Sequence, residues 1–341
     1  MVWDEMYLRR IPGLREDDWF RCGEGTRLFL RKWPVPGDAG NRPRALLCVV
    51  HGMAEHAGRY DRLAERLAGA GIEVWAADLR GHGRTADLAV NHPGRGGLLG
   101  HCRDRNGFAA VCVDIHNLNH LMLFERPGIP LFLLGHSWGS FLSQDLISSI
   151  ERMGSGGRTL AGCILSGTRN PGGLKVQLGS PFLSLLAGLR GSRSRSELAR
   201  ALADGPYRKA FLPARTPFDW LSGDEVDAYI ADPLCGMLCS LGFYRDLAYG
   251  LRYLNSARAG RRIRRDLPIL ILGGKLDPVG DFGAGPEALA ARYRRLGLED
   301  VGLVLYPDAR HEIFNDTCRE EAATDLISWI CDHLSGTEEH P

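Results

Sequence analysis

The sequence predicts an α/β fold in which a mostly parallel sheet is covered by helices on both faces, and three observations support this. Short apolar runs alternate along the chain with segments whose apolar residues recur at helical spacing. The run at 45–50 is apolar throughout, which is typical of a strand buried on both faces of a parallel sheet. The alternation breaks between about 170 and 261 and resumes at 267, which indicates an insertion into one α/β unit.

The individual elements follow from the same two periodicities. Strands are expected at 27–31, 45–50, 72–77, 130–134, 160–166, 267–272 and 302–306. Helices are expected where apolar residues recur every three or four positions, around 60–67, 108–122, 141–150, 289–296 and 322–334. We find no internal repeats.

Composition and charge exclude several classes of protein. The 341 residues are 44% hydrophobic and 24% charged, which is ordinary for a soluble globular protein. The net charge of +1 gives no field that would attract nucleic acid, so we expect no nucleic-acid partner. No stretch reaches the roughly 18 apolar residues of a membrane span. The first five residues include two acids and show no signal-peptide pattern, so we expect a cytoplasmic protein.

No metal or cofactor is expected either. The nine cysteines are odd in number and widely spread, which favours reduced thiols over a disulfide framework. Cys235 and Cys239 lack a second pair or a nearby histidine that would complete a zinc site. The sequence contains no phosphate-binding loop and no dinucleotide fingerprint.

The interrupted region has an uneven charge distribution. Arginine and lysine dominate residues 190–215, and acids dominate the segment from 219 to 232. We interpret this region as a solvated helical insertion in preference to a specific anion site.

The most informative motif is Gly135-His136-Ser137-Trp138-Gly139. It lies between an apolar strand and a helical pattern, as a nucleophile elbow does. The turn holds the serine in a strained conformation above the sheet, and a Cβ at either glycine would crowd the neighbouring strand or helix. We therefore predict that Ser137 is a catalytic nucleophile.

The partners of Ser137 follow from chain order, because in this architecture an acid and then a histidine follow the serine. His311 comes five residues after the last expected strand and is the candidate general base. Asp277 follows the preceding strand and is the candidate acid that orients His311, with Asp281 as its rival and Asp308 as a weaker third.

An oxyanion hole needs two backbone donors. One is expected from the amide of Trp138, directly after the nucleophile. The second is expected from Met53, in the loop after the strand at 45–50, where Gly52 lets the loop approach closely. The Met53 side chain is open to two interpretations, as a lining of the acyl pocket or as core filler.

Four segments together resemble the monoacylglycerol lipase and bacterial lysophospholipase branch of the α/β-hydrolases, also called the serine aminopeptidase-like group. They are the His-Gly-x-x-Glu-His-x-x-Arg-Tyr motif at 51–60, the Asp-x-x-Gly-His-Gly motif at 78–83, the elbow at 135–140, and Asp-Pro-Val at 277–279. The resemblance covers nearly the whole chain. The family often has methionine at the position of Trp138, and the bulkier side chain here is expected to narrow the pocket.

The resemblance implies an α/β-hydrolase fold with an eight-stranded sheet and a helical cap between its sixth and seventh strands. The core would comprise residues 1–170 and 261–341, and the cap residues 171–260. It also implies a triad of Ser137, Asp277 and His311, with Met53 and Trp138 as oxyanion donors.

The expected function is a serine hydrolase that cleaves carboxylic esters, most readily a monoacylglycerol or lysophospholipid, through an acyl-enzyme. The alternatives are a short-chain esterase, an aminopeptidase and a non-catalytic ligand-binding hydrolase fold; free acids at the pocket mouth would favour the peptidase. The apolar cap segments at 181–186 and 238–244 have three interpretations: they line an acyl tunnel, touch a membrane surface transiently, or pack the cap on the core. The sequence does not determine the oligomeric state.

Overall fold

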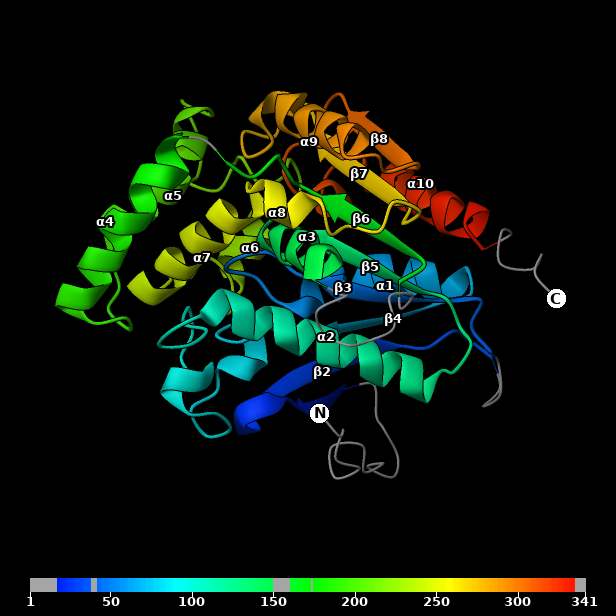
Figure 1. Cartoon of the computed structure of the whole chain (residues 1–341), viewed down its shortest axis with the longest axis horizontal. Helices are drawn as coiled ribbons and strands as arrows, with labels where there is room; N and C mark the ends of the chain where they lie inside the picture. Colours follow the sequence, from blue (N-terminus) through cyan, green and yellow to red (C-terminus); the bar gives the residue numbers. More distant parts are fainter. Residues whose placement is uncertain (1–16, 38–41, 150–159, 173, 335–341) are drawn as a thin grey trace.

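The computed structural model describes residues 17–37, 42–149, 160–172 and 174–334. Its centre is an eight-stranded sheet in the order β1-β2-β4-β3-β5-β6-β7-β8 (Figure 1). Strands β3 to β8 are parallel to one another, whereas β2 pairs antiparallel with both β1 and β4. The strands are β1 (Asp17–Arg21), β2 (Arg27–Trp33), β3 (Ala45–Val50), β4 (Ile72–Ala77), β5 (Leu131–His136), β6 (Gly162–Ser166), β7 (Ile269–Gly274) and β8 (Val301–Tyr306).

Helices cover both faces of the sheet. Successive residues of each central strand point to opposite faces, and in β3 Leu46 and Cys48 belong to one apolar cluster, whereas Leu47 and Val49 belong to the other. The first cluster is closed by α2 (Gly107–Glu125), α3 (Trp138–Ser149) and α9 (Ala284–Arg295). The second is closed by α1 (Asp61–Gly69) and α10 (Arg319–Asp332). Burial on both sides explains why these strands are apolar throughout.

The cap consists of helices that all lie between β6 and β7 in the chain. They are α4 (Leu174–Arg190), α5 (Glu197–Lys209), α6 (Val226–Ala231), α7 (Leu241–Leu254) and α8 (Ala257–Gly260). Helix α7 packs against α2 and α3 of the core, and α4 lies on α7 at the edge of the molecule (Figure 1).

Short 3-10 helices occupy several loops, mostly near strand ends. They are η2 (Gly23–Gly25), η3 (Ala57–Tyr60), η4 (Gly83–Ala86), η5 (Pro93–Arg95), η7 (Asp281–Gly283) and η8 (Ile313–Asn315). None of the helices in the described part of the chain is both long and apolar enough to cross a membrane.

The expected fold is confirmed, including the eight-stranded sheet and the helical insertion. All seven strands located from the sequence pattern are present, and the 45–50 and 72–77 strands have the expected bounds. The pattern missed β1, a short edge strand whose sequence Asp-Asp-Trp-Phe-Arg has no alternating apolar face. The first five residues and Ile150 lie outside the described residues, and the division of the chain at 170/171 and 260/261 stays a prediction.

Candidate active site

Ser137 lies at the tip of a strained turn between β5 and α3. Its φ of +52° is in the left-handed region, which non-glycine residues adopt only where surrounding contacts enforce it. The turn is held by the Ser137 amide, which donates to the Ser166 carbonyl at 2.9 Å, and by the Ser140 amide, which donates to the Ser137 carbonyl at 2.9 Å. The geometry is that of a nucleophile elbow.

The two glycines of the elbow are required by packing. A Cβ on Gly135 would lie 2.5 Å from the carbonyl oxygen of Gly139, and a Cβ on Gly139 would lie 2.6 Å from the carbonyl oxygen of His51. Both distances are below any real carbon–oxygen contact, so helix α3 could not approach β3 and β5 this closely with larger residues.

His311 and Asp277 come together from the loops after the last two strands. His311 Nδ1 donates to Asp277 Oδ2 at 3.0 Å, and both side chains are almost fully buried. The other carboxylate oxygen of Asp277 accepts from the Val279 amide at 2.8 Å, which fixes the carboxylate plane. Asp281 and Asp308, the rival acids, are exposed.

The electrostatic environment of His311 favours its protonated form. Burial alone lowers the pKa of an imidazole, but the negative charge and hydrogen bond of Asp277 outweigh it, with Glu312 and Glu55 adding to the same effect. The pKa of His311 is therefore raised. An imidazole with this shift is suited to accept a proton.

The loop after β3 approaches Ser137 closely. A Cβ on Gly52 would lie 3.2 Å from the Ser137 Cβ and 2.7 Å from Glu55 Oε1. The Gly52 amide donates to Glu55 Oε1 at 2.5 Å. His51 is fully buried; its Nε2 accepts from the Leu79 amide at 2.9 Å, so its Nδ1 donates to the Gly52 carbonyl at 2.8 Å. These bonds fix the backbone around Met53, the predicted oxyanion donor.

Trp138 carries its side chain into the interface between core and cap. Its ring stacks on His82 at 5.1 Å between centroids and meets the edge of Phe243 of α7 at 4.9 Å. The Asp-x-x-Gly-His-Gly motif thus supplies a platform for the tryptophan. The bulk of Trp138 is taken up by this packing, and its backbone amide stays at the first turn of α3.

A buried ionic network, which the sequence analysis missed, braces the site. Arg59 binds Glu312 with two bonds of 2.5 and 2.7 Å and reaches Glu55 Oε2 at 3.3 Å. Tyr60 donates to Glu55 Oε1 at 3.1 Å. The Glu-His-x-x-Arg-Tyr part of the 51–60 motif was the available signal, but its partner Glu312 is 253 positions away from Arg59.

The cap is fastened to both functional loops. The Trp220 carbonyl accepts from the His311 amide at 3.4 Å, and the Leu221 carbonyl accepts from the Glu312 amide at 2.8 Å. Tyr229 of α6 donates to the Ala54 carbonyl at 2.9 Å. Cap residues therefore fix the position of the loop after β3 and of the histidine loop.

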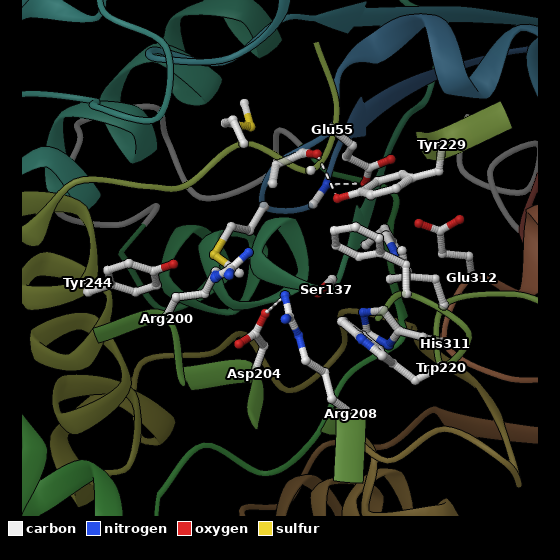
Figure 2. Close-up of a pocket in the computed structure, with 18 residues that line it drawn as sticks. Glu55, Ser137, Arg200, Asp204, Arg208, Trp220, Tyr229, Tyr244, His311 and Glu312 are labelled. Carbon is white, nitrogen blue, oxygen red and sulfur yellow. Dashed lines mark hydrogen bonds and ion pairs between the residues drawn. The ribbon is translucent and has the colours of Figure 1, made fainter. Parts of the chain in front are cut away.

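A cavity between core and cap contains Ser137 and His311 (Figure 2). Its apolar lining includes Met53, Phe218, Trp220, Leu221, Tyr229, Met237 and Tyr244. Met53 both lines this cavity and packs against the core, so its two interpretations hold together.

Helix α5 contributes Arg200, Asp204 and Arg208 to the same cavity (Figure 2). The interpretation of the basic segment as a solvated surface is wrong for these three residues, because they are wholly or partly buried at the site. Helical periodicity was the available signal, since their spacing of four places them on one face.

One group could hold a metal ion among the residues that the structure describes, and it differs from the cysteine pair considered in the sequence. His56, Asp232 and Cys235 present ligand atoms within 4.8 Å of one another. The group has an ordinary hydrogen-bonding role: His56 Nδ1 accepts from the Gly58 amide at 3.1 Å and Nε2 lies 2.8 Å from Asp232 Oδ2. It joins η3 of the core to the cap.

The sheet order, the elbow and the capped cavity define an α/β-hydrolase. The chain belongs to the serine aminopeptidase S33 family, whose model matches residues 41–318. This confirms the family resemblance drawn from the four sequence motifs, and the protein is an ester hydrolase of the lipase and esterase type.

Similar proteins cover nearly the whole chain. The monoacylglycerol lipase of Mycolicibacterium smegmatis is 30% identical in an alignment of 329 residues that covers 95% of this chain and 100% of that protein. The monoglyceride lipase of Mus musculus is 28% identical over 92% of this chain and 89% of that protein. Among solved structures, a thermostable carboxyl esterase from Bacillus coagulans in complex with glycerol superimposes with a TM-score of 0.82 at 25% identity, covering 93% of this chain and 98% of that one.

Proposed function

We propose that this protein hydrolyses monoacylglycerols or lysophospholipids through an acyl-enzyme on Ser137. The observation that carries the proposal is the hydrogen bond between buried Asp277 and buried His311, which lines the same cavity as the strained serine. The names of the relatives, two of them monoacylglycerol lipases, support a glycerol-based lipid ester.

In the proposed reaction, Nε2 of His311 takes the Oγ proton of Ser137 while the oxygen attacks the ester carbonyl carbon. The resulting oxyanion accepts hydrogen bonds from the amides of Met53 and Trp138. The bond to the leaving alcohol then breaks, and the alcohol takes the proton from His311. A water molecule gives its proton to His311, attacks the acyl carbonyl and releases the fatty acid, and Ser137 recovers its proton. Asp277 holds the imidazole in the required tautomer and stabilises the imidazolium.

An ester is favoured over a peptide amine as substrate. Three carboxylates line the cavity, and each has an arginine partner: Arg59 for Glu55 and Glu312, and Arg208 for Asp204. A peptidase that recognises a free N-terminal amine would need an acid that is not already neutralised.

The decisive experiment is labelling of the purified protein with a fluorophosphonate, together with rates on decanoylglycerol, lysophosphatidylcholine and p-nitrophenyl esters. Modification of Ser137, located by peptide mass spectrometry, and hydrolysis of a lipid ester are expected. A protein that binds these lipids but is neither labelled nor active would be the non-catalytic alternative.

The cap also offers a surface for contact with a lipid aggregate. Helix α4 exposes Phe182, Leu185 and Leu189 at spacings of three and four, and α5 exposes Leu198 and Leu202. We infer that this apolar surface rests on the membrane or micelle that holds the substrate. Co-sedimentation with phospholipid vesicles should fall in a Leu185→Asp, Leu189→Asp variant, whereas its rate on p-nitrophenyl acetate should not change.

A further inference from the structure

Three charged side chains on helix α5 share the cavity with Ser137. Arg200, Asp204 and Arg208 are spaced by four residues, so they form one row along the helix. All three point into the space in front of Ser137 and His311 (Figure 2). A neutral acylglycerol carries no charged group that could pair with these side chains. A neutral substrate therefore does not account for their presence in the cavity.

Arg208 has unused hydrogen-bonding capacity. Its Nε and Nη2 are buried and have no hydrogen-bond partner among the described residues, and the same holds for Oδ1 of Asp204. Arg208 Nη2 lies 3.0 Å from Asp204 Oδ2 and forms an ion pair with it. Nε and Nη2 form the planar edge that binds a carboxylate or phosphate with two parallel bonds.

A satisfied edge of the same kind occurs elsewhere in this chain. Arg193 donates from Nε and Nη2 to the two oxygens of Asp104 at 2.7 and 2.6 Å. Because burying guanidinium donors without partners is costly, the corresponding edge of Arg208 indicates that a ligand oxyanion completes it.

The charge balance of the row also favours an anion. Arg200 and Arg208 are two cations, and Asp204 between them is the only anion of the row. Arg200 forms an ion pair with Glu197. The Glu197 side chain is 67% exposed, and such surface ion pairs contribute little stability. The other cavity carboxylates, Glu55 and Glu312, are already bound by Arg59.

We propose that the preferred ester carries a carboxylate or phosphate on its alcohol part, and that Arg208, assisted by Arg200, binds this anionic group. The inference rests on the proposed ester hydrolysis and narrows its substrate class to acylglycerol phosphates and similar anionic esters. Arginine suits this role because its rigid fork matches the geometry of both anions.

The test compares three purified substrates with the same acyl chain: decanoylglycerol, decanoylglycerol phosphate and decanoylglycerate. The wild-type kcat/KM should be at least about tenfold higher on one or both anionic esters than on the neutral one, and the two anionic substrates separate phosphate from carboxylate recognition. Arg208→Gln should reduce the anionic-to-neutral ratio of kcat/KM by about 10- to 100-fold, the usual effect of losing a hydrogen bond to a charged group. Arg200→Gln should reduce it less.

Lys209→Gln is the matched control, since it removes a positive charge from the adjacent exposed position of the same helix. The ratio in this variant should equal that of the wild type. Binding gives a readout independent of turnover: calorimetry on Ser137→Ala should give tighter binding of the anionic than of the neutral ester, and a second replacement, Arg208→Gln, should remove the difference.

Three results would overturn the inference. The first is an equal kcat/KM on neutral and anionic esters in the wild type. The second is an unchanged ratio in Arg208→Gln. The third is a uniform gain in Arg208→Gln on all three esters, which would make the row a plug of the cavity. In each case hydrolysis that depends on Ser137 leaves the proposed function intact, whereas absence of any ester hydrolysis removes both proposals.

Discussion

Arg59 and Glu312 form a buried two-pronged ion pair that joins the segment after β3 to the loop that carries His311. The pair fixes two parts of the site that are separated by most of the sequence. Since Arg59 also contacts Glu55, which binds the Gly52 amide, one guanidinium links the predicted oxyanion loop to the predicted general base.

Replacement of Ser137 by alanine should abolish ester hydrolysis without unfolding the protein. The expected loss in kcat is on the order of 10⁶-fold, as when a triad serine is removed from other hydrolases. Steady-state rates on p-nitrophenyl esters measure it, and circular dichroism checks the fold. Wild-type turnover in this variant would remove Ser137 from the mechanism.

Asp277→Asn should lower kcat by about 10⁴-fold, because an amide stabilises the wrong tautomer of His311. Asp281→Asn is the control, since that side chain is exposed and comes from the same loop. The two variants are compared in single-turnover rates on one ester. Greater damage from the change at Asp281 would reverse the assignment.

The acid limb of the pH profile should lie above the ordinary imidazole value. A general base must be neutral, and the pKa of His311 is raised by Asp277 against the opposing effect of burial, with a further contribution from Glu312. kcat/KM should therefore fall as the pH drops through this raised pKa. In Glu312→Gln, one of the charges that raise the pKa is gone, so the acid limb should move to lower pH; a limb that stays in place would contradict the coupling.

Glu312→Gln should also reduce the free energy of unfolding by about 3 kcal/mol, because it leaves the buried Arg59 with one weaker partner. Chemical denaturation at neutral pH measures the change. Glu65→Gln removes an acid from the exposed side of α1 and should have almost no effect. Equal effects of the two changes would mean that the pair does not hold the loops together.

The cavity lining should set acyl-chain preference. Each methylene buried in an apolar site contributes about 0.8 kcal/mol, so decanoyl esters should exceed acetyl esters by orders of magnitude if this burial is kept in the transition state. Met237 lines the cavity, whereas Phe243 packs against Trp138, so Met237→Asp is the more direct test. It should lower the decanoate-to-acetate ratio of kcat/KM. A parallel fall in both rates would make the cap a lid without selectivity.

The sequence by itself determined the layered sheet, the elbow and the order of the predicted triad. These depend on local features: strands buried on both faces are apolar throughout, glycine alone fits two positions before and two positions after Ser137, and loops after parallel strands converge at one edge. For this reason Asp277 could be placed after β7 and His311 after β8 before any contact was known. The edge strand β1 escaped because its residues carry no such pattern.

Only the tertiary structure decided what surrounds that framework. Arg59 binds Glu312, and the carbonyls of Trp220 and Leu221 bind the histidine loop, although these residues are far apart in sequence. The same holds for Arg208, which lines a cavity with Ser137. A basic stretch has the same composition whether its arginines face water or a cavity. The spacing of four places Arg200, Asp204 and Arg208 on one face of the helix, but whether that face meets water or the cavity depends on how α5 packs over the carboxyl ends of the strands.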